Sequence, residues 1–495
     1  MEFFITPMIR PSRLALLTFL TAAFAPVLPA AESSRPNVLF LAVDDLRDDL
    51  GAYGVAHART PNLDRFASGA RFFTRHYVQV PTCGASRCAL VRGAYPTEAA
   101  HLNNNAILST HGAWQGRNLP AWFRTRGYRT LSLGKITHYP GNLTGRQWAE
   151  GPEELPGAWD RAWIPESPWR TAEAMMHGYA NGRPRTPGKT LPWEAFDGPD
   201  TAYPDAWVAA DAVRTLGELQ GSTQPWFLAV GLFKPHLPFA APRKYFDLHD
   251  PEKIPLPENP TQPQGTTGWH ASSELRRNYG NDGRDPASDP AYVRHLRQAY
   301  AAATSYVDAQ AGRILDALQT HGLDRNTIVV VWGDHGFLLG DHAIWGKHCL
   351  YERALRSPLM IRVPGLTKPG QPSAAVVETV DIFPTLADLC GLPVPEGLDG
   401  RSLRAQLNDP AAPSAKPALG FWTGGQRTVR TERWRLIAHG DAAADPAKSV
   451  ELFDLNSDPT EKRNVAAQEP AVTRELLSRL RPLIPSEPRA KKKSE

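Results

Sequence analysis

Asn37-Val38-Leu39-Phe40-Leu41-Ala42-Val43-Asp44-Asp45 is the stretch that decides the fold of this chain. Its apolar part shows no alternation of polar and apolar residues, which is typical of a strand buried on both faces of a parallel sheet. Two carboxylates follow at the carboxyl end, where open α/β sheets place their ligands. Paired carboxylates suit a hard divalent cation, which takes several oxygen ligands. They equally suit the first turn of a helix, where an acidic side chain acts as a cap.

A second stretch repeats this pattern far along the chain. Thr327-Ile328-Val329-Val330-Val331-Trp332 leads into Gly333-Asp334-His335-Gly336. Two separate apolar strands that each end in a potential ligand pair favour a shared metal site over two coincidental helix caps.

Helical patterns separate the apolar stretches of the chain. Two further strands, 130–134 and 227–233, precede Lys135 and Lys234. The intervening helical patterns cover Leu63–Ala70, Leu119–Arg126, Ala206–Leu219 and Gln298–His321. Alternation of this kind predicts an α/β fold with a large, mainly parallel sheet between helices. The segments 148–204 and 251–290 lack periodicity, and we expect them to form a pocket rim.

A cysteine motif lies between the first strand and these elements. Cys83-Gly84-Ala85-Ser86-Arg87 places a fixed positive charge near a thiol, and such surroundings lower a thiol pKa and make it reactive. The alternative interpretation is a half-buried cysteine at the start of a short apolar helix through Val91.

The same motif, followed by Gly93, resembles the signature of the sulfatase family. The resemblance covers almost the whole mature chain and is closest to the iduronate-2-sulfatase-like branch. It implies an alkaline-phosphatase-like fold, one calcium ion and oxidation of Cys83 to formylglycine. A formylglycine-generating enzyme or an anaerobic sulfatase-maturing enzyme would carry out that oxidation. Ala85 replaces the commoner proline, so the motif leaves open which of the two enzymes acts.

The resemblance also implies the site residues. Calcium would be held by Asp44, Asp45, Cys83, Asp334 and His335. The catalytic residues would be Cys83, Arg87, Lys135, His138, His236 and Lys347. The family mechanism has the hydrated aldehyde attack sulfur, with calcium and Arg87 activating the attacking hydroxyl. His236 or Lys347 then protonates the leaving group, and His138 deprotonates the second hydroxyl so that sulfate leaves. Asp341 and His342, just before Lys347, are interpreted as loop structure.

Residues 1–31 have the order of a secretory signal peptide. Arg10 and Arg13 precede an apolar run, 14–28, which small residues follow at Ala30 and Ala31. The run is short for a membrane span, although a retained anchor is the alternative. We therefore expect a periplasmic or secreted protein without stable membrane insertion.

Composition excludes two classes of protein. Four cysteines among 495 residues do not make a disulfide scaffold. A net charge of +4 on a chain of this length does not indicate a nucleic-acid partner.

After the expected catalytic domain, residues 32–400, we expect a C-terminal subdomain over residues 401–495. Residues 400–417 are interpreted as a connection. Alternating stretches at 427–430, 434–438 and 451–455 predict a small antiparallel sheet, and Asp458-Pro459-Thr460-Glu461 starts a closing turn and helix. A basic tail, 489–493, ends the chain.

The sequence thus predicts an exported sulfatase that acts on sulfated carbohydrates, either sulfated glycans or glycosaminoglycan fragments. One alternative is a phosphomonoesterase or phosphodiesterase of the same superfamily, whose members use serine or threonine where this chain has Cys83. The other is a non-catalytic protein that binds sulfated glycans, if Cys83 stays a thiol.

Overall fold

The structure is a computed structural model that describes residues 1–4, 8, 35–112, 114–142, 152–169, 171–267, 270, 272, 274–441 and 446–484. Most of the expected signal peptide and the whole basic tail lie outside the described residues. The chain divides into two units, Met1–Ser34 and Arg35–Glu495. Among the described residues, no helix combines the length and the hydrophobicity that a membrane span needs.

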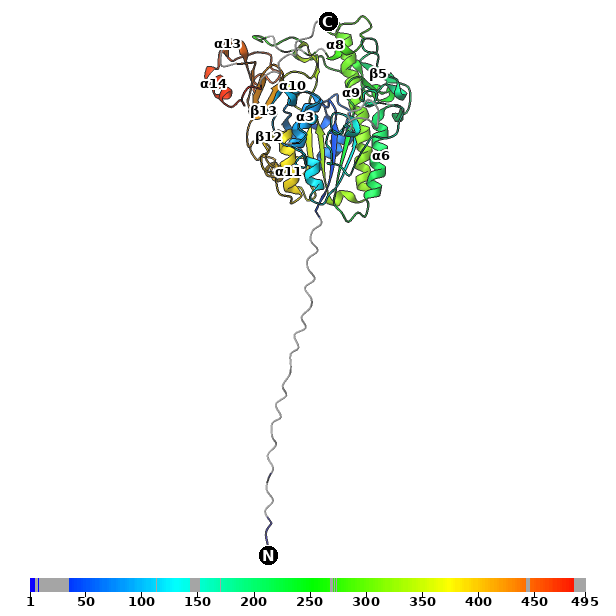
Figure 1. Ribbon diagram of the computed structural model, residues 1–495, viewed down its shortest axis with the longest axis vertical. Helices are drawn as coiled ribbons and strands as arrows, with labels where there is room; N and C mark the ends of the chain where they lie inside the picture. The colour runs from blue at the N-terminus through cyan, green and yellow to red at the C-terminus, as the bar shows by residue number, and fades with distance from the viewer. Residues whose placement is uncertain are drawn as a thin grey trace. The chain divides into compact units, whose positions relative to one another are not determined.

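The core of the larger unit is a sheet of eight strands (Figure 1). In spatial order they are β12 (Pro372–Glu378), β2 (Arg71–Tyr77), β11 (Leu359–Arg362), β8 (Thr327–Gly333), β1 (Asn37–Val43), β6 (Trp226–Leu232), β3 (Arg129–Gly134) and β4 (Arg161–Trp163). All of them run in parallel except β11, which is antiparallel to β2 and β8. The expected large, mainly parallel sheet is therefore confirmed.

Strand β1 lies at the centre of this sheet, between β6 and β8, and its side chains feed two separate cores. Leu39, Leu41 and Val43 pack with α1 (Pro61–Ser68), α6 (Pro204–Leu219) and α9 (Pro290–Thr320). Val38, Phe40 and Ala42 pack with α2 (Cys83–Arg92), α4 (Leu119–Arg124) and α11 (Ile382–Leu389) on the other face. Burial on both faces explains the unbroken apolar run in the sequence.

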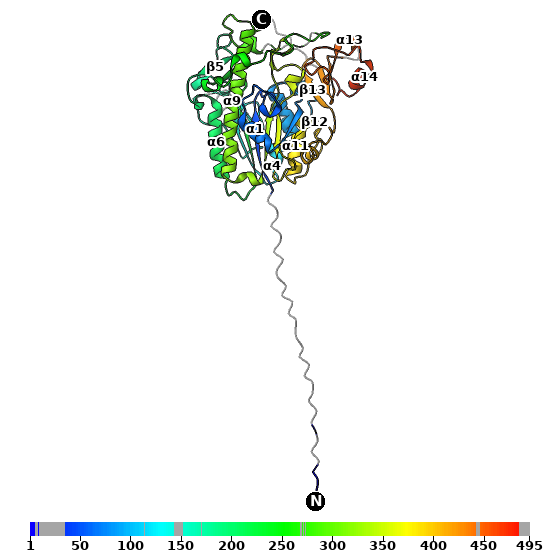
Figure 2. The ribbon, with the colours of Figure 1, turned by 180° about the vertical axis from the view of Figure 1, so that it is seen from behind.

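Helices α6 and α9 lie side by side along one flank of the sheet (Figures 1 and 2). The prediction placed the start of α9 at Gln298, but the helix begins at Pro290. Asp289 caps it by accepting a hydrogen bond from the Tyr292 backbone N–H at 2.9 Å. A capping aspartate followed by proline is a strong helix start, and the apolar pattern alone did not reveal it.

Short elements surround the carboxyl edge of the sheet. Strand β5 (Trp193–Phe196) pairs with β7 (Phe239–Pro242), and β9 (Leu338–Leu339) pairs with β10 (Trp345–Gly346). Helix α8 (Glu274–Asn278) lies against β10, the strand that ends directly before Lys347. The remaining short helices are α3 (Ala106–Ser109), α5 (Ala172–Met176), α7 (Arg243–Phe246), α10 (Glu352–Leu355) and α13 (Pro446–Ser449).

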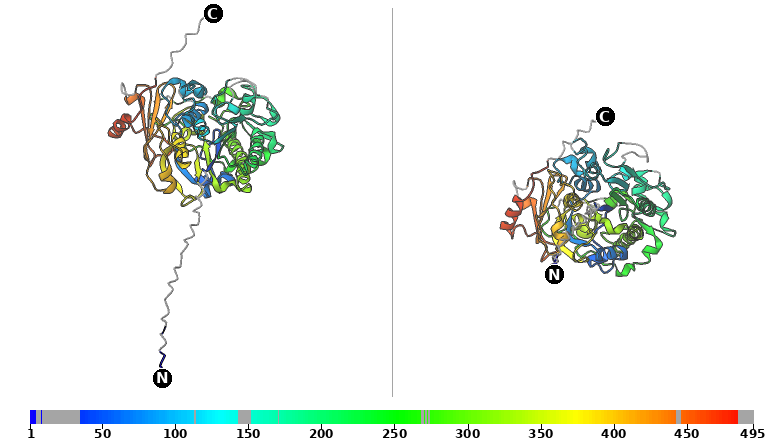
Figure 3. Two further views of the ribbon diagram at one scale, coloured as in Figure 1. Left: turned by 60° about the horizontal axis from the view of Figure 1, so that its bottom comes forward. Right: turned by 90° about the horizontal axis from the view of Figure 1, so that it is seen from below.

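The C-terminal region forms a second, antiparallel sheet, which Figure 3 shows in orange. Its order is β13 (Ala418–Trp422), β14 (Gln426–Arg430), β15 (Trp434–Ala438) and β16 (Val450–Asp454). This confirms the expected small sheet, although β13 was not predicted. The connection before it contains a short helix, α12 (Arg404–Asn408), and the closing helix α14 (Pro470–Ser478) begins later than the turn at Asp458 indicated. The domain boundary at residue 400 stays a prediction.

Candidate active site

The two acidic strand ends meet because β1 and β8 are adjacent and parallel, with Val43 opposite Gly333. Asp44 and Asp334 therefore leave the sheet side by side. Asp45 has a φ of 58°, a left-handed turn that brings its side chain to the same place as that of Asp44. Its backbone N–H donates to Asp334 Oδ1 at 2.9 Å. The strand ends thus bring three carboxylates together in the interior.

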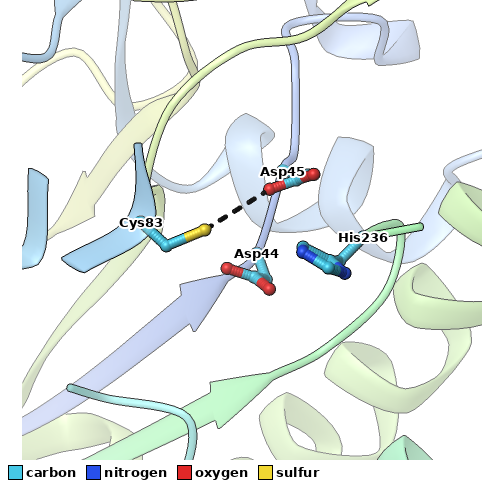
Figure 4. A group of neighbouring side chains, drawn as sticks. All are labelled: Asp44, Asp45, Cys83 and His236. Atoms are coloured by element: carbon cyan, nitrogen blue, oxygen red, sulfur yellow. Dashed lines mark hydrogen bonds between the residues drawn. The ribbon is translucent and has the colours of Figure 1, made fainter. Parts of the chain in front are cut away.

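Cys83 points into this group from the first position of α2. Its Sγ lies 3.8 Å from Asp45 Oδ1 and 3.2 Å from His335 Nε2. Figure 4 shows Cys83, Asp44, Asp45 and His236 facing a common space. One potential ligand atom from each of these four residues lies within 4.8 Å of the others, and the same holds for Cys83, Asp334 and His335.

Three buried cations surround the carboxylates. Lys135 Nζ lies 2.5 Å from Asp44 Oδ2, and Lys347 Nζ lies 2.8 Å from Asp45 Oδ1. Arg87 pairs with Asp44 at 3.0 Å and with Asp334 at 2.9 Å. We call these three carboxylates, three cations and Cys83 the Cys83 cluster.

The structure contradicts one prediction from the sequence, namely that the surroundings of Cys83 lower the pKa of its thiol. The pKa of Cys83 is raised well above its usual value by burial and by the Asp44 carboxylate, against the lowering effect of Lys135 and Lys347. Arg87 does not reverse this shift, and its guanidinium N–H groups bond to Asp44, Asp334 and the Lys135 and Ile136 carbonyls. The unmodified side chain is therefore a neutral thiol and a weak nucleophile.

The three carboxylates differ in their pKa values. Burial raises the pKa of Asp45 and of Asp334, even though Lys347, His335 and Arg87 act in the opposite direction. Burial also opposes ionisation of Asp44, but Lys135, His236 and Arg87 hold its pKa well below the usual range. Ionisation of Asp45 and Asp334 is therefore disfavoured, whereas Asp44 is a stable anion. A further cation in this site would favour the ionised forms of Asp45 and Asp334.

His335 shows how a metal ion fits this donor set. Its Nδ1 lies 2.9 Å from the Gly336 carbonyl oxygen and donates there, so Nε2 is the ring nitrogen that can ligate a metal ion. This Nε2 atom lies 3.2 Å from Cys83 Sγ and 3.4 Å from Asp45 Oδ1. Carboxylate oxygens together with an unprotonated imidazole nitrogen are a suitable ligand set for a divalent cation.

The two remaining histidines named from the sequence lie at the same edge of the sheet. The pKa of His236 is held well below 6.5 by burial and by Lys347, and that of His138 by burial and by Lys135. Both imidazoles are therefore neutral at pH 7. Lys234, which also follows a buried strand, turns away and donates to the His236 and Pro238 carbonyls.

Two residues near the Cys83 cluster were not predicted from the sequence. Glu274, on α8, lies 3.5 Å from Lys347 Nζ, and its Oε2 is buried without a hydrogen-bond partner among the described residues. The ring of His177 lies 5.3 Å from that of His236. Both residues come from the aperiodic segments, where no pattern marks an individual side chain.

Other predicted features have structural roles. Asp341 accepts hydrogen bonds from Arg47 and from the Leu339 backbone, and His342 stacks on Tyr351 at 4.0 Å, so both stabilise their loop. All four cysteines are free and buried, which agrees with the expectation that disulfides do not build this fold. Cys88 belongs to α2 and packs in the core.

Comparison with known proteins identifies the class. A family model described as "Sulfatase" matches residues 36–392, and a second, "N-sulphoglucosamine sulphohydrolase, C-terminal", matches residues 340–485. Together with the fold and site, these matches show that the chain belongs to the sulfatase family, whose members hydrolyse sulfuric esters.

Individual relatives sharpen this assignment. Human iduronate 2-sulfatase is 32% identical over 415 residues, which cover 75% of this chain and 72% of that protein. A sulfatase of Formosa agariphila is 30% identical and covers 88% of this chain and 84% of its own length. Among solved structures, a phosphonate monoester hydrolase of Agrobacterium radiobacter superposes with a TM-score of 0.73 at 25% identity, over 90% of this chain and 95% of that one.

Proposed function

We propose that this enzyme is an exported sulfatase that removes sulfate from carbohydrates with a formylglycine made from Cys83 and a calcium ion. The observation that carries the proposal is the convergence of Cys83 with three carboxylates and three buried cations. Formylglycine would supply the nucleophile as a hydrated aldehyde, and Ca²⁺ held by Asp44, Asp45, Asp334, His335 and the modified residue 83 would supply a Lewis acid. A formylglycine-generating or anaerobic sulfatase-maturing enzyme is the implied partner.

Lys135 and Lys347 place two ammonium groups around Cys83, where a sulfate ester would bind. Burial lowers their pKa values, but Asp44 beside Lys135 and Asp45 beside Lys347, together with the other anionic groups of the site, raise them on balance, so both lysines stay charged and neutralise sulfate oxygens. Arg87 acts differently, because its N–H groups bond to carboxylates and carbonyls. We assign Arg87 the role of positioning Asp44 and Asp334, in place of the direct activation that the family resemblance suggested.

The two neutral histidines divide the proton transfers. His236 Nδ1 donates to the Leu237 carbonyl at 2.7 Å, so Nε2 would first take up a proton from solvent and then pass it to the leaving alkoxide. An anionic sulfate group beside this ring favours its protonation. His138 Nδ1 is buried without a hydrogen-bond partner among the described residues, and an unprotonated nitrogen of this kind suits a general base.

Sulfate release from defined oligosaccharides tests the activity. We expect protein from the native host to release sulfate from disaccharides that carry a 2-O-sulfated uronic acid, by analogy with iduronate 2-sulfatase. The same disaccharides sulfated only on the amino sugar are the matched controls for position. A phosphonate monoester and a phosphodiester control for the chemistry of the similarly folded hydrolase. Hydrolysis of these esters without any sulfate release would contradict the proposal.

The calcium proposal has its own test. Treatment with EGTA should abolish sulfate release, and added Ca²⁺ should restore it. Without the cation, the raised pKa values of Asp45 and Asp334 disfavour the ionised carboxylates of the site. Unchanged turnover by protein shown to be calcium-free by elemental analysis would exclude calcium as the cofactor.

A further inference from the structure

A second group of metal-ligating side chains lies outside the Cys83 cluster. His270, His439 and Glu451 place one potential ligand atom each within 4.8 Å of one another. His270 comes from the aperiodic segment before α8, His439 directly follows β15, and Glu451 lies in β16. The group therefore joins that segment to the C-terminal sheet.

The two imidazoles converge on one carboxylate oxygen. Glu451 Oε2 lies 2.5 Å from His270 Nε2 and 3.3 Å from His439 Nε2. Neighbouring ligand atoms of a tetrahedral zinc ion are about 3.3 Å apart, given zinc–ligand distances of about 2.0–2.1 Å. The His439 distance already matches this value, and a small outward shift of the His270 ring would complete the geometry.

The other oxygen of Glu451 is held in place by the protein. Glu451 Oε1 accepts hydrogen bonds from Thr266 Oγ1 at 2.7 Å and from the Thr267 backbone N–H at 2.9 Å. Metal-binding carboxylates are commonly oriented by hydrogen bonds of this kind to their outer oxygen. The two oxygens thus have separate partners, and Oε2 is the one that faces the imidazoles.

The groups around the Glu451 carboxylate favour a metal ion. Its side chain and that of His270 are completely buried, and that of His439 is 4% exposed. Among the described residues no lysine or arginine pairs with Glu451, whereas Asp44 and Asp45 each have a buried cationic partner. A buried carboxylate with two imidazoles at its side and no lysine or arginine partner is a ligand set that zinc prefers.

We propose that His270, His439 and Glu451 form a binding site for a divalent transition-metal ion, with zinc as the best match. The ion would tether the segment around His270 to β15 and β16. That segment continues to Glu274, which lies 3.5 Å from Lys347 Nζ, so the tether would also hold one side of the Cys83 cluster. The proposal is independent of the reaction, since it rests on side chains outside that cluster.

Zinc content measures this site directly. The full chain is stripped with a chelator, dialysed against zinc, and analysed for zinc per chain together with His439→Gln and Glu451→Gln. His321→Gln, which changes a half-buried histidine at the end of α9, is the matched control. We expect wild type and the control to bind one zinc ion more than the two cluster variants. Zinc should also raise the Tm of wild type but not that of Glu451→Gln. Equal zinc content in all four proteins would overturn the proposal.

A measurement on the unaltered chain guards against misfolded variants. Protein made without maturation keeps the Cys83 sulfur, and one equivalent of zinc is added to it. X-ray absorption should then show nitrogen and oxygen ligands with imidazole scattering and no sulfur. A sulfur ligand at about 2.3 Å would place the ion at Cys83 and overturn the assignment.

Discussion

Two clusters of buried charge in this protein look alike in composition and differ in chemistry. One is the Cys83 cluster, and the other is the junction network, in which Glu352 joins α10 to Arg430 and Arg435 of the C-terminal sheet at 3.1 and 2.6 Å. Burial opposes ionisation of Glu352, but these arginines hold its pKa far below the usual range. In the Cys83 cluster the pKa values of Asp45 and Asp334 are raised instead.

The two clusters differ in the groups that surround their charged side chains. Glu352 Oε1 accepts from the Tyr77 hydroxyl at 2.6 Å, and its Oε2 meets the two arginines, so both oxygens are satisfied. In the Cys83 cluster the Cys83 thiol and His335 Nε2 lie 3.2 Å apart among the carboxylates. Buried ion pairs alone therefore do not mark a site, whereas groups with unused ligand or nucleophile capacity among them do.

The largest expected effect is that of Cys83→Ala on activity. Loss of the nucleophile should lower kcat for sulfate release by about 10⁴-fold or more. The Tm should change little, because the ion pairs around residue 83 remain. The measurement combines steady-state kinetics with thermal unfolding. Comparable turnover in the variant would remove Cys83 from the reaction.

Glu352→Ala should show the opposite pattern. It leaves Arg430 and Arg435 buried without their carboxylate, a change that costs about 3–5 kcal/mol of unfolding free energy. Urea unfolding measures the loss, and kcat per folded molecule should be unchanged. Glu475→Ala, which removes an exposed helical carboxylate paired with Arg479, is the control and should leave the urea midpoint unchanged. A fall in kcat at normal stability would mean that the junction network acts in catalysis.

Lys135→Met tests whether a cation of the Cys83 cluster works on the substrate. The variant should lose about 10²–10³-fold in kcat, since one charge that stabilises the transition state is gone. Stability should fall less than in Glu352→Ala, because Asp44 keeps Arg87 as a partner. If unfolding free energy falls while kcat is retained, Lys135 is a structural residue.

The smallest predicted effect concerns the pH dependence of stability. The pKa of Glu352 is lower in the folded protein than its unfolded value of 4.5, so the unfolded chain binds more protons as acid is added. The contribution of Glu352 is therefore complete above pH 4.5 and is lost as the pH falls below it. Glu352→Gln should reduce the slope of unfolding free energy against pH below 4.5 by up to about 1.4 kcal/mol per pH unit. Parallel curves for the two proteins would contradict this assignment of the pKa.

Much of the fold could be predicted because the central strands are buried on both faces. Asn37–Val43 matches β1 residue for residue, and the stretch at 327–332 matches β8 within one residue. Strand β2 was missed because Arg71, Thr74 and His76 interrupt its apolar pattern, although they lie within the main sheet. Strand β11 was missed because four residues are too few to show a period.

The candidate site could be predicted as a set of residues but not as a set of interactions. Strand-end carboxylates and family motifs identified Asp44, Asp334 and Cys83, and the structure brings them together. The raised pKa of the thiol could not be foreseen, because it depends on burial and on the nearby Asp44 carboxylate. Glu274 contacts Lys347 only through the packing of α8 on β10, which local sequence does not encode.

Mass spectrometry of the tryptic peptide His76–Arg87 tests the central claim most directly. The protein should come from its native host, and the same preparation should be assayed for sulfate release. We predict that residue 83 has the mass of the aldehyde or its hydrate and does not react with a thiol-alkylating reagent. A preparation that releases sulfate while residue 83 remains a fully alkylatable cysteine would contradict the formylglycine mechanism.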